Sequence, residues 1–333
     1  MRIAINGFGR IGRTFFRLAF QDPKIEIIAI NDLADIDNLA YLLKYDTVYG
    51  RYDKEVQTQN GEKIIVNDKE ILFFQEKDPK NLPWEELKID VVVEATGVFA
   101  DYLKAKAHIK AGAKKVIITA PADEEEENEG RTVLLGINDE ELAKFEVISN
   151  GSCTTNAVAP VIQVLEEKIG IEKAVLNTVH AYTSSQRLVD SAGSDDWRRG
   201  RAANQNIIPS TTGAAKCVTK VIKGLKDKFD GIALRVPLIC GSLADITFIA
   251  KRPTSKEEIN EILEQASRKK RWAGIIEVSS QSLVSSDIIG TLAPAIIDLN
   301  FTKVVDNDLA KLLVWYDNEW AYSSTLLQQI KKI

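Results

Sequence analysis

Short, continuous runs of hydrophobic residues dominate the first 120 positions of the chain. Four of them share an apolar centre: "RIAING" (2–7), "IEIIAIND" (25–32), "KIDVVVEAT" (88–96) and "KKVIITAP" (114–121). Such near-continuous runs are typical of strands that are covered on both faces in a parallel sheet. Segments with helical spacing, "GRTFFRLAFQ" (12–21) and "ADYLKAKAHIKAGA" (100–113), lie between them. The alternation predicts an α/β domain.

A different pattern interrupts this alternation between residues 51 and 89. Polar and apolar positions surround two turn signals there, Asn60-Gly61 and Asn67-Asp68. Such pairs favour tight hairpin turns, so we expect an antiparallel excursion inserted into the α/β unit.

The second half of the chain alternates less regularly. Its strand-like segments are "AVLNTVHAYT" (174–183), "GIALRVPLI" (231–239), "ADITFIAKRP" (244–253) and "KLLVWYDNEW" (311–320). Helices are expected after Asn156, Gly213 and Ser255. This pattern predicts an α+β domain with a mixed or antiparallel sheet.

Composition narrows the class of protein. A length of 333 residues suggests two domains, and a hydrophobic fraction of 45% with 27% charged residues is ordinary for a globular protein. The formal net charge of −5 argues against a general nucleic-acid binder. We see no signal-peptide pattern and no apolar run long enough to span a bilayer. The acidic run that begins at Asp123 is expected to be a solvated loop.

The three cysteines, Cys153, Cys217 and Cys240, are widely spaced. Their spacing makes neither a disulfide framework nor a paired zinc motif. We therefore expect a reduced, cytoplasmic protein without a metal site.

A glycine-rich motif, "GFGRIG" (7–12), closes the first strand and opens the first helix. Gly7 allows the turn, Gly9 lets the backbone approach a pyrophosphate, and Gly12 permits close packing of helix and strand. The N–H groups and positive dipole of the helix N-terminus favour bound phosphate. Asp32 ends the next strand, where its carboxylate would bind ribose hydroxyls and repel a 2′-phosphate. The motif favours NAD over NADP, although such glycines also occur in purely structural turns.

Cys153 lies between a strand ending, "VISN" (147–150), and the amphipathic helix "TTNAVAPVIQVLEEKIG" (154–170). The dipole at a helix N-terminus favours the thiolate, which is the reactive form of cysteine. Ser152 and Thr154 flank it with hydroxyls able to bind an anion. A small buried hydrophobe is the alternative interpretation of such a cysteine.

The chain has two histidines, His108 and His180. His108 lies in the lysine-rich "LKAKAHIKAGAKK" (103–115), which we expect to form a solvated helix face. His180 ends an apolar strand and is the natural base for the suspected thiolate, although many histidines at strand ends are structural.

Six motifs together carry a resemblance to a known family: "INGFGRIGR", "SCTTN", "HAYTSSQ", "NIIPSTTGAAK", "LRVP" and "WYDNEW". In this order and spacing they resemble phosphorylating glyceraldehyde-3-phosphate dehydrogenase over essentially the whole chain. The resemblance implies NAD-dependent oxidation and phosphorylation of glyceraldehyde 3-phosphate in glycolysis. It also implies a homotetramer.

The resemblance assigns roles to particular residues. Cys153 would form a thiohemiacetal and then a thioester, and His180 would act as base. The residues implied for substrate and phosphate binding are Ser152, Thr154, Thr183, Arg198, Thr212, Gly213 and Arg235. Those implied for the cofactor, beyond the glycines and Asp32, are Arg10, Ile11, Thr96, Gly97, Thr119, Asn318 and Tyr322.

The resemblance also implies the domain boundaries. A Rossmann-like NAD-binding domain is expected over residues 1–152 and a catalytic domain over 153–318. A C-terminal helix, about 319–333, is expected to pack back on the first domain.

The chain departs from the family in three places, including "RVPLICGSLADI" (235–246), where Cys240 is expected to be packing. The other two bear on phosphate and cofactor binding. Ser184-Ser185 replaces an acidic residue of many bacterial members, and Ala192 stands where NAD-specific members usually have proline. The departure at Ala192 weakens the expected exclusion of NADP. Three alternatives stay open: erythrose-4-phosphate dehydrogenase, a non-catalytic NAD-binding protein of the same fold, and a cysteine hydrolase that leaves the glycine motif unexplained.

Overall fold

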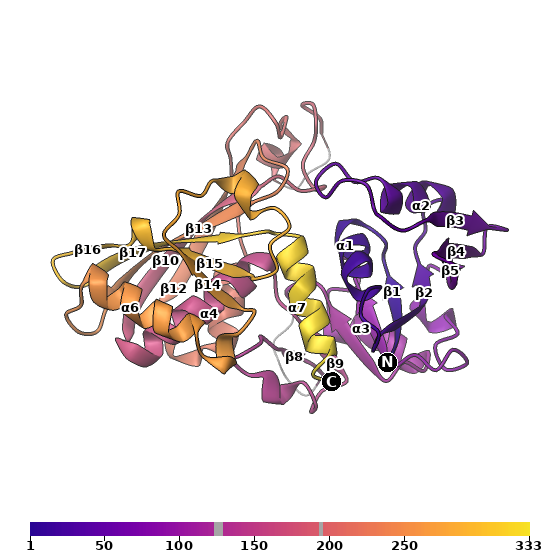
Figure 1. Ribbon diagram of the computed structural model, residues 1–333, viewed down its shortest axis with the longest axis horizontal. Coiled ribbons are helices and arrows are strands. Elements are labelled where there is room, and N and C mark those ends of the chain that lie inside the picture. The colour runs from indigo at the N-terminus through magenta and orange to yellow at the C-terminus, as the bar shows by residue number, and fades with distance from the viewer. Residues whose placement is uncertain (123–128, 193–195) are drawn as a thin grey trace. The chain divides into compact units, whose positions relative to one another are not determined.

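The computed structural model describes residues 1–122, 129–192 and 196–333. Most of the acidic run that begins at Asp123 lies outside the described residues. The chain divides into two compact units, shown in Figure 1. The first comprises Met1–Val133, Asn138–Gly151 and Ser323–Ile333, and the second comprises Leu134–Ile137 and Ser152–Tyr322.

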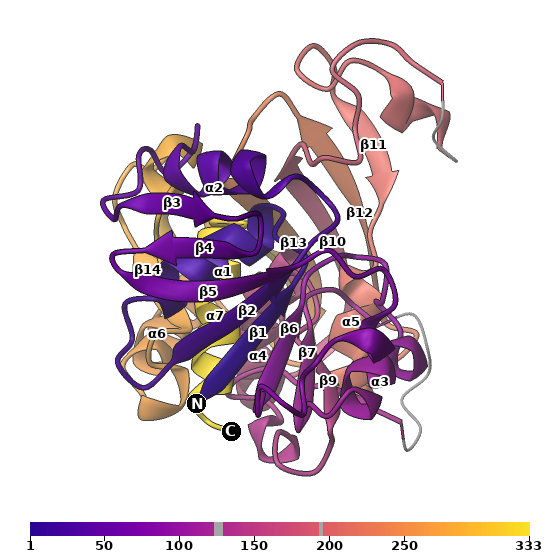
Figure 2. The same cartoon turned by 90° about the vertical axis from the view of Figure 1, so that its right-hand side faces the viewer.

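The described part of the first unit is built on a nine-stranded sheet with the order β3-β4-β5-β2-β1-β6-β7-β9-β8 (Figure 2). Its strands are β1 Arg2–Asn6, β2 Glu26–Asn31, β3 Val56–Gln59, β4 Lys63–Val66, β5 Lys69–Phe74, β6 Val91–Glu94, β7 Lys115–Ile118, β8 Arg131–Thr132 and β9 Val147–Ser149. The strands β2, β1, β6, β7 and β9 run parallel to one another, as the continuous apolar runs predicted.

The expected antiparallel excursion is confirmed. Strands β3 and β4 pair antiparallel, as do β4 and β5, before β5 joins the parallel sheet beside β2. Asn60 and Gly61 have φ values of 55° and 72°, and Asn67 and Asp68 have 43° and 65°. Two successive residues with positive φ make the tight hairpin turns that Asn and Gly favour.

The described α-helices of the first unit are α1 Arg10–Ala19, α2 Ile36–Lys44, α3 Tyr102–Lys110 and most of α7 Trp320–Ile330. The expectation that His108 lies on a solvated face of α3 is wrong, because His108 is fully buried. Tyr102, Ala105 and His108 recur at every third position and form the buried face of the helix. The lysines between them made the segment look polar throughout.

The described part of the second unit is built on an eight-stranded mixed sheet. The order is β11-β12-β10-β13-β17-β15-β14, and β16 pairs with β17. Its strands are β10 Ile171–Ala181, β11 Ile208–Thr211, β12 Phe229–Val236, β13 Ser242–Ala250, β14 Ile276–Ser279, β15 Ala295–Asp298, β16 Lys303–Val305 and β17 Leu309–Tyr316. Strands β10 and β12 are parallel, whereas β13 is antiparallel to both β10 and β17. The mixed sheet agrees with the sequence prediction.

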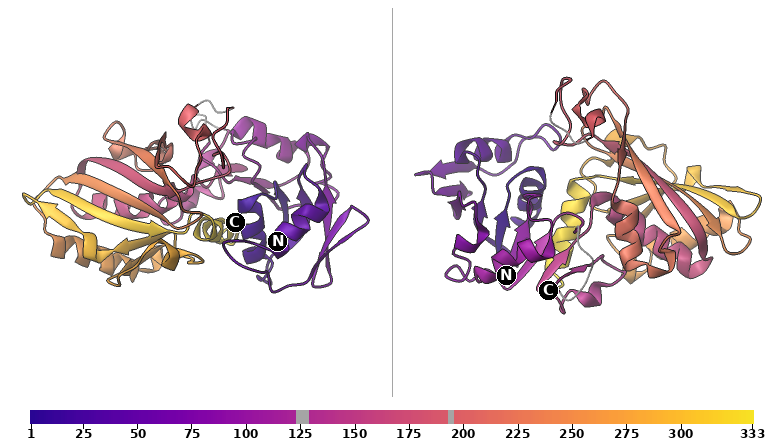
Figure 3. Two further views of the ribbon diagram at one scale, coloured as in Figure 1. Left: turned by 90° about the horizontal axis from the view of Figure 1, so that it is seen from above. Right: turned by 180° about the vertical axis from the view of Figure 1, so that it is seen from behind.

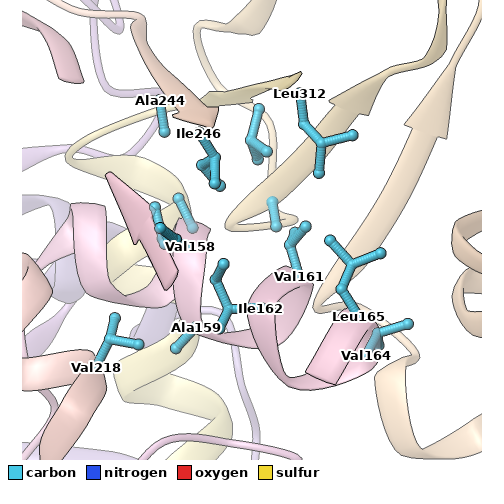
Figure 4. Close-up of a cluster of buried hydrophobic side chains, with 14 of the residues drawn as sticks. Val158, Ala159, Val161, Ile162, Val164, Leu165, Val218, Ala244, Ile246 and Leu312 are labelled. Carbon is cyan, nitrogen blue, oxygen red and sulfur yellow. The ribbon is translucent and has the colours of Figure 1, made fainter. Parts of the chain in front are cut away.

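Three helices, α4 Cys153–Lys168, α5 Ala214–Val221 and α6 Lys256–Ser267, lie on one face of this sheet (Figure 3). Val158, Val161, Ile162 and Leu165 of α4 recur at helical spacing and point into the core. Their side chains meet Ala244, Ile246 and Leu312 of the sheet (Figure 4). Burying each large aliphatic side chain contributes roughly 1.5–3 kcal/mol, so this packing holds α4 against the sheet.

None of the helices in residues 1–122, 129–192 and 196–333 is long and apolar enough to cross a membrane. The same residues contain no group of three or more histidine, cysteine or acidic side chains placed to hold a metal ion.

Candidate active site and cofactor pocket

Helix α4 begins at Cys153, close to where the sequence pattern placed it. Ser152 caps the helix, because its Oγ accepts a hydrogen bond of 3.0 Å from the backbone N–H of Thr155. Cys153 therefore lies in the first turn, and its Sγ is 3.4 Å from Nε2 of His180. His180 lies near the end of β10, so the strand and the helix bring the thiol and the imidazole together.

Arg235 lies on the other side of the imidazole. The parallel register of β10 and β12 pairs His180 with Arg235, whose Nη1 is 2.6 Å from Nδ1 of His180. The same Nη1 donates to the carbonyl oxygen of Ala181 at 3.1 Å, and that oxygen is 2.7 Å from Nδ1.

These contacts allow two tautomers of His180, since a guanidinium group only donates. If Nδ1 accepts from Arg235, Nε2 carries the proton and donates to Cys153. If Nδ1 donates to the Ala181 carbonyl, Nε2 is free to accept the thiol proton. The arrangement can therefore move a proton at Nε2 in either direction.

The electrostatics of the pair favour two neutral groups. Burial raises the pKa of the Cys153 thiol above its ordinary value, and the positive charge of Arg235 opposes this only in part. Burial, together with the charge of Arg235, lowers the pKa of His180 to about 3. The helix dipole was expected to favour the thiolate, but the loss of solvation outweighs it here. A neutral imidazole beside a thiol has a lone pair for the thiol proton, but its lowered pKa and the raised pKa of the thiol both oppose the transfer in the absence of substrate.

Tyr316 supports this site and was missed by the sequence analysis. Its hydroxyl lies 2.8 Å from Thr154 Oγ1 and 2.7 Å from Thr178 Oγ1. Its ring meets that of His180 edge-on, with centroids 5.9 Å apart. Tyr316 lies inside the quoted "WYDNEW" motif, but only the pairing of distant strands shows what it touches.

The other residues implied for anion binding make local hydrogen bonds. Thr212 Oγ1 accepts from the N–H of Ala214 at 3.2 Å, next to Gly213 at the start of α5. Thr183 Oγ1 lies 3.0 Å from Ser185 Oγ. The exposed Arg198 donates to the carboxylate of Asp196 at 2.9 and 3.0 Å.

Asn318 has a fixed side-chain orientation. Its Oδ1 accepts hydrogen bonds from Ser242 Oγ at 2.9 Å and from the N–H of Gly241 at 3.2 Å. Two donors at one atom identify that atom as the amide oxygen. Ser242 Oγ in turn accepts from the N–H of Ala181, which links Asn318 to the end of the His180 strand. Tyr322 is buried in α7 Trp320–Ile330.

A cavity of about 410 Å³ lies at the carboxyl ends of the parallel strands in the first unit. It is lined by Asn6, Gly7, Gly9, Asn31, Asp32, Leu33, Glu76, Lys77, Ala95, Thr96, Val98 and Phe99. A Cβ on Gly7 would lie 2.6 Å from Thr96 N, and a Cβ on Gly12 would lie 2.1 Å from Gly7 O. A Cβ on Gly9 would meet no atom within 4 Å. The turn therefore has no room for a side chain at Gly7 or Gly12, whereas the space next to Gly9 is open. This arrangement fits a bound dinucleotide.

Asp32 and Arg10 are each held by neighbouring groups. The Asp32 carboxylate accepts from Phe8 N at 2.6 Å and from Ala34 N at 2.9 Å. Arg10 forms an ion pair with the buried carboxylate of Asp46.

Three further residues implied for the cofactor lie in the first unit. Ile11 is half-buried in the first turn of α1, and Thr119 donates its N–H to the carbonyl of Glu94. Gly97 has a φ of 74° in the exposed turn after β6.

Comparisons with known proteins agree with this geometry. The family model for the C-terminal domain of glyceraldehyde 3-phosphate dehydrogenase matches residues 152–318, and the model for its NAD-binding domain matches residues 1–102. The chain is 47% identical over 340 residues to glyceraldehyde-3-phosphate dehydrogenase of Borreliella burgdorferi, covering 100% of this chain and 99% of the relative. It is 45% identical over 335 residues to glyceraldehyde-3-phosphate dehydrogenase 2 of Bacillus subtilis, covering 100% and 96%. The enzyme of Geobacillus stearothermophilus is 46% identical over 325 residues, covering 97% and 95%.

Two family models and full-length relatives thus agree on one assignment. The chain belongs to the glyceraldehyde-3-phosphate dehydrogenase family of oxidoreductases, and its cofactor is NAD.

Proposed function

We propose that this chain oxidises glyceraldehyde 3-phosphate and phosphorylates it to 1,3-bisphosphoglycerate. One observation carries the proposal: Cys153 Sγ lies 3.4 Å from Nε2 of a neutral His180. A half-buried thiol with a base at that distance is the arrangement that nucleophilic catalysis requires.

The first half-reaction uses this pair. His180 Nε2 accepts the thiol proton of Cys153, Sγ attacks the aldehyde carbon, and the carbonyl oxygen is protonated to give a thiohemiacetal. The backbone N–H of Cys153 and His180 Nε2–H can stabilise the oxygen while it is negative. His180 then removes the hydroxyl proton as the aldehyde hydrogen leaves as hydride, and a thioester remains on Cys153. Bound NAD supplies the acceptor for that hydride.

The second half-reaction uses inorganic phosphate. A phosphate oxygen attacks the thioester carbon, the C–S bond breaks, and the acyl phosphate leaves. The Cys153 thiolate takes a proton back from His180.

Two anion sites are part of the proposal. Arg235 and Thr183 would hold the phosphate of the substrate, because a guanidinium fork binds phosphate through charge-assisted hydrogen bonds. Ser152, Thr154, Thr212 and Gly213 would hold the attacking phosphate, and Arg198 belongs to the same substrate and phosphate set.

The cofactor-binding residues of the proposal follow from the family resemblance. Its members are Gly7, Gly9, Arg10, Ile11, Gly12, Asp32, Thr96, Gly97, Thr119, Asn318 and Tyr322. Asp32 would bind the ribose hydroxyls. Asn318, whose Oδ1 is held by Ser242 and Gly241, would present its amide nitrogen to the nicotinamide carboxamide.

We further propose a domain boundary at 152, with a C-terminal helix that belongs to the NAD-binding domain. Two features support it: the compact units meet between Gly151 and Ser152 in the chain, and Ser323–Ile333 belongs to the first unit.

A homotetramer and a cytoplasmic location complete the proposal. The exposed apolar side chains of Leu188, Val189, Trp197 and Ile207 support a subunit interface, since Trp197 alone is 88% exposed. Cys153, Cys217 and Cys240 form no disulfide in the described part of the chain, which supports a reducing compartment.

The proposal is tested by following NADH formation with purified protein, NAD, phosphate and one of two aldehydes. Glyceraldehyde 3-phosphate is expected to give the higher kcat/KM. A higher value with erythrose 4-phosphate would assign the chain to that substrate instead.

A further inference from the structure

A buried polar network lies beneath the cavity of the first unit, and neither the glycine motif nor the proposed mechanism uses it. Its members are almost completely shielded from solvent: Asn6, Asn31, Trp84, Glu94 and His108. They come from α3, from the loop before β6 and from the ends of β1, β2 and β6. Burying polar groups costs free energy unless each finds a partner, so their pairing is informative.

Trp84 determines which nitrogen of His108 carries the proton. The indole Nε1 of Trp84 donates to Nδ1 of His108 at 3.0 Å. An indole N–H can only donate, so Nδ1 is an acceptor and Nε2 carries the proton. Nε2 lies 3.1 Å from Oε2 of Glu94, and His108 therefore donates to that carboxylate.

The Glu94 carboxylate accepts hydrogen bonds from both sides of the network. Its Oε2 also accepts from Asn6 Nδ2 at 2.5 Å. Its Oε1 accepts from the backbone N–H of Thr96 at 2.8 Å and from Thr96 Oγ1 at 2.5 Å. Each of these partners is a donor, so the carboxylate acts only as an acceptor and fixes the orientation of Thr96 and Asn6.

The network ends in the wall of the cavity. Asn6 Oδ1 accepts from Asn31 Nδ2 at 2.7 Å, and Asn31 Oδ1 accepts from the N–H of Glu76 at 2.8 Å. Asn6, Asn31, Glu76 and Thr96 all line the cavity. Phe99 also lines the cavity. Its ring packs edge-on against the ring of His108, with the ring centroids 6.3 Å apart.

We propose that His108 is a positioning residue for NAD: held by Trp84, it orients Glu94, and Glu94 orients the cavity wall at Thr96 and Asn6. The inference rests on the proposed cofactor site in this cavity. Helix α3 already docks through Tyr102 and Ala105, so apolar packing alone would attach it. His108 also donates to Glu94, the carboxylate that holds Thr96 and Asn6 in the cavity wall. Its role therefore extends beyond attaching the helix.

The test compares NAD binding and stability in matched variants. His108→Leu introduces an apolar side chain of similar size and loses both hydrogen bonds. His108→Gln can both accept from Trp84 and donate to Glu94. Tyr102→Phe is the control, because it removes a buried contact of 3.2 Å with Thr132 from the same helix without touching the cavity wall.

Calorimetry measures the dissociation constant for NAD, and thermal unfolding measures stability. The proposal predicts that His108→Leu raises that constant about 10-fold or more. His108→Gln should recover most of the affinity, and Tyr102→Phe should leave it unchanged at a lower melting temperature. A His108→Leu protein that melts earlier but binds NAD like the wild type would overturn the proposal.

A second variant decides the question if His108→Leu does not fold. Glu94→Gln keeps the shape but places an amide N–H₂ among donors, and the same rise in the dissociation constant is expected. Unchanged NAD affinity in Glu94→Gln would overturn the proposal. Wild-type protein that binds NAD without oxidising either aldehyde would overturn the proposed function and leave this inference standing.

Discussion

Arg235 and His180 face each other across two parallel strands, with Arg235 Nη1 2.6 Å from His180 Nδ1. The guanidinium charge adds to burial in keeping the imidazole neutral. A residue proposed to bind the substrate phosphate thus also sets the protonation of the proposed base.

The first prediction concerns this contact. Arg235→Leu removes the positive charge, so the pKa of His180 should rise from about 3 but stay below its ordinary value, since burial remains. The chain has only two histidines, so NMR titration of the ring protons measures this directly. The same variant should raise the KM for the aldehyde about 10-fold or more through loss of a charged phosphate donor. An unchanged His180 titration would show that burial alone sets the pKa.

The second prediction concerns the nucleophile. Cys153→Ser should lower turnover by about 1,000-fold or more, because a serine hydroxyl is far harder to ionise than a thiol. NAD affinity, measured on the same preparation, should stay close to that of the wild type. Cys217→Ser is the control, since Cys217 is buried in α5. Near-normal turnover of Cys153→Ser would remove Cys153 from the mechanism.

The third prediction is a pH dependence of stability. The pKa of His180 is lower in the folded protein than in the unfolded chain, so the unfolded chain binds the proton more tightly between about pH 6.5 and 3. The contribution of neutral His180 is fully present above that window and is lost as the pH falls through it. His180→Gln should therefore lose less stability than the wild type on acidification, by up to a few kcal/mol. Urea unfolding at pH 7 and at pH 4.5 gives the difference, and equal losses would contradict it.

The fourth prediction concerns cofactor choice. Asp32 also holds the N–H groups of Phe8 and Ala34, so removal of its whole side chain would disturb the turn. Asp32→Asn keeps an acceptor but removes the charge that repels a 2′-phosphate. We expect the ratio of kcat/KM for NAD to that for NADP to fall about 10-fold. If the ratio does not change, discrimination lies elsewhere, for example near Ala192.

The sequence revealed those parts of the molecule that depend on local pattern. Continuous apolar runs identified the parallel strands, and Asn60-Gly61 identified a hairpin. The start of α4 near Cys153 followed from the strand ending before it. These features need only neighbouring residues, so they can be predicted from the sequence.

The features that sequence analysis missed depend on distant partners. His108 is buried because Trp84 and Glu94 satisfy its ring nitrogens, and its lysine neighbours conceal this. Tyr316 bonds to Thr154, a residue 162 positions away in the chain. The raised pKa of Cys153 comes from burial by the folded unit, which outweighs the local helix dipole. Only tertiary packing brings such groups together.

The most direct test of the account is NADH formation with and without inorganic phosphate. A thioester on Cys153 needs phosphate as its acceptor, as expected for covalent catalysis in two half-reactions. Rapid mixing in phosphate-free buffer should give a burst of about one NADH per active site and then slow turnover. Added phosphate should restore steady turnover and saturate, and Thr212→Ala should need more of it. Full steady-state turnover without phosphate would contradict the account, because water would then resolve the thioester.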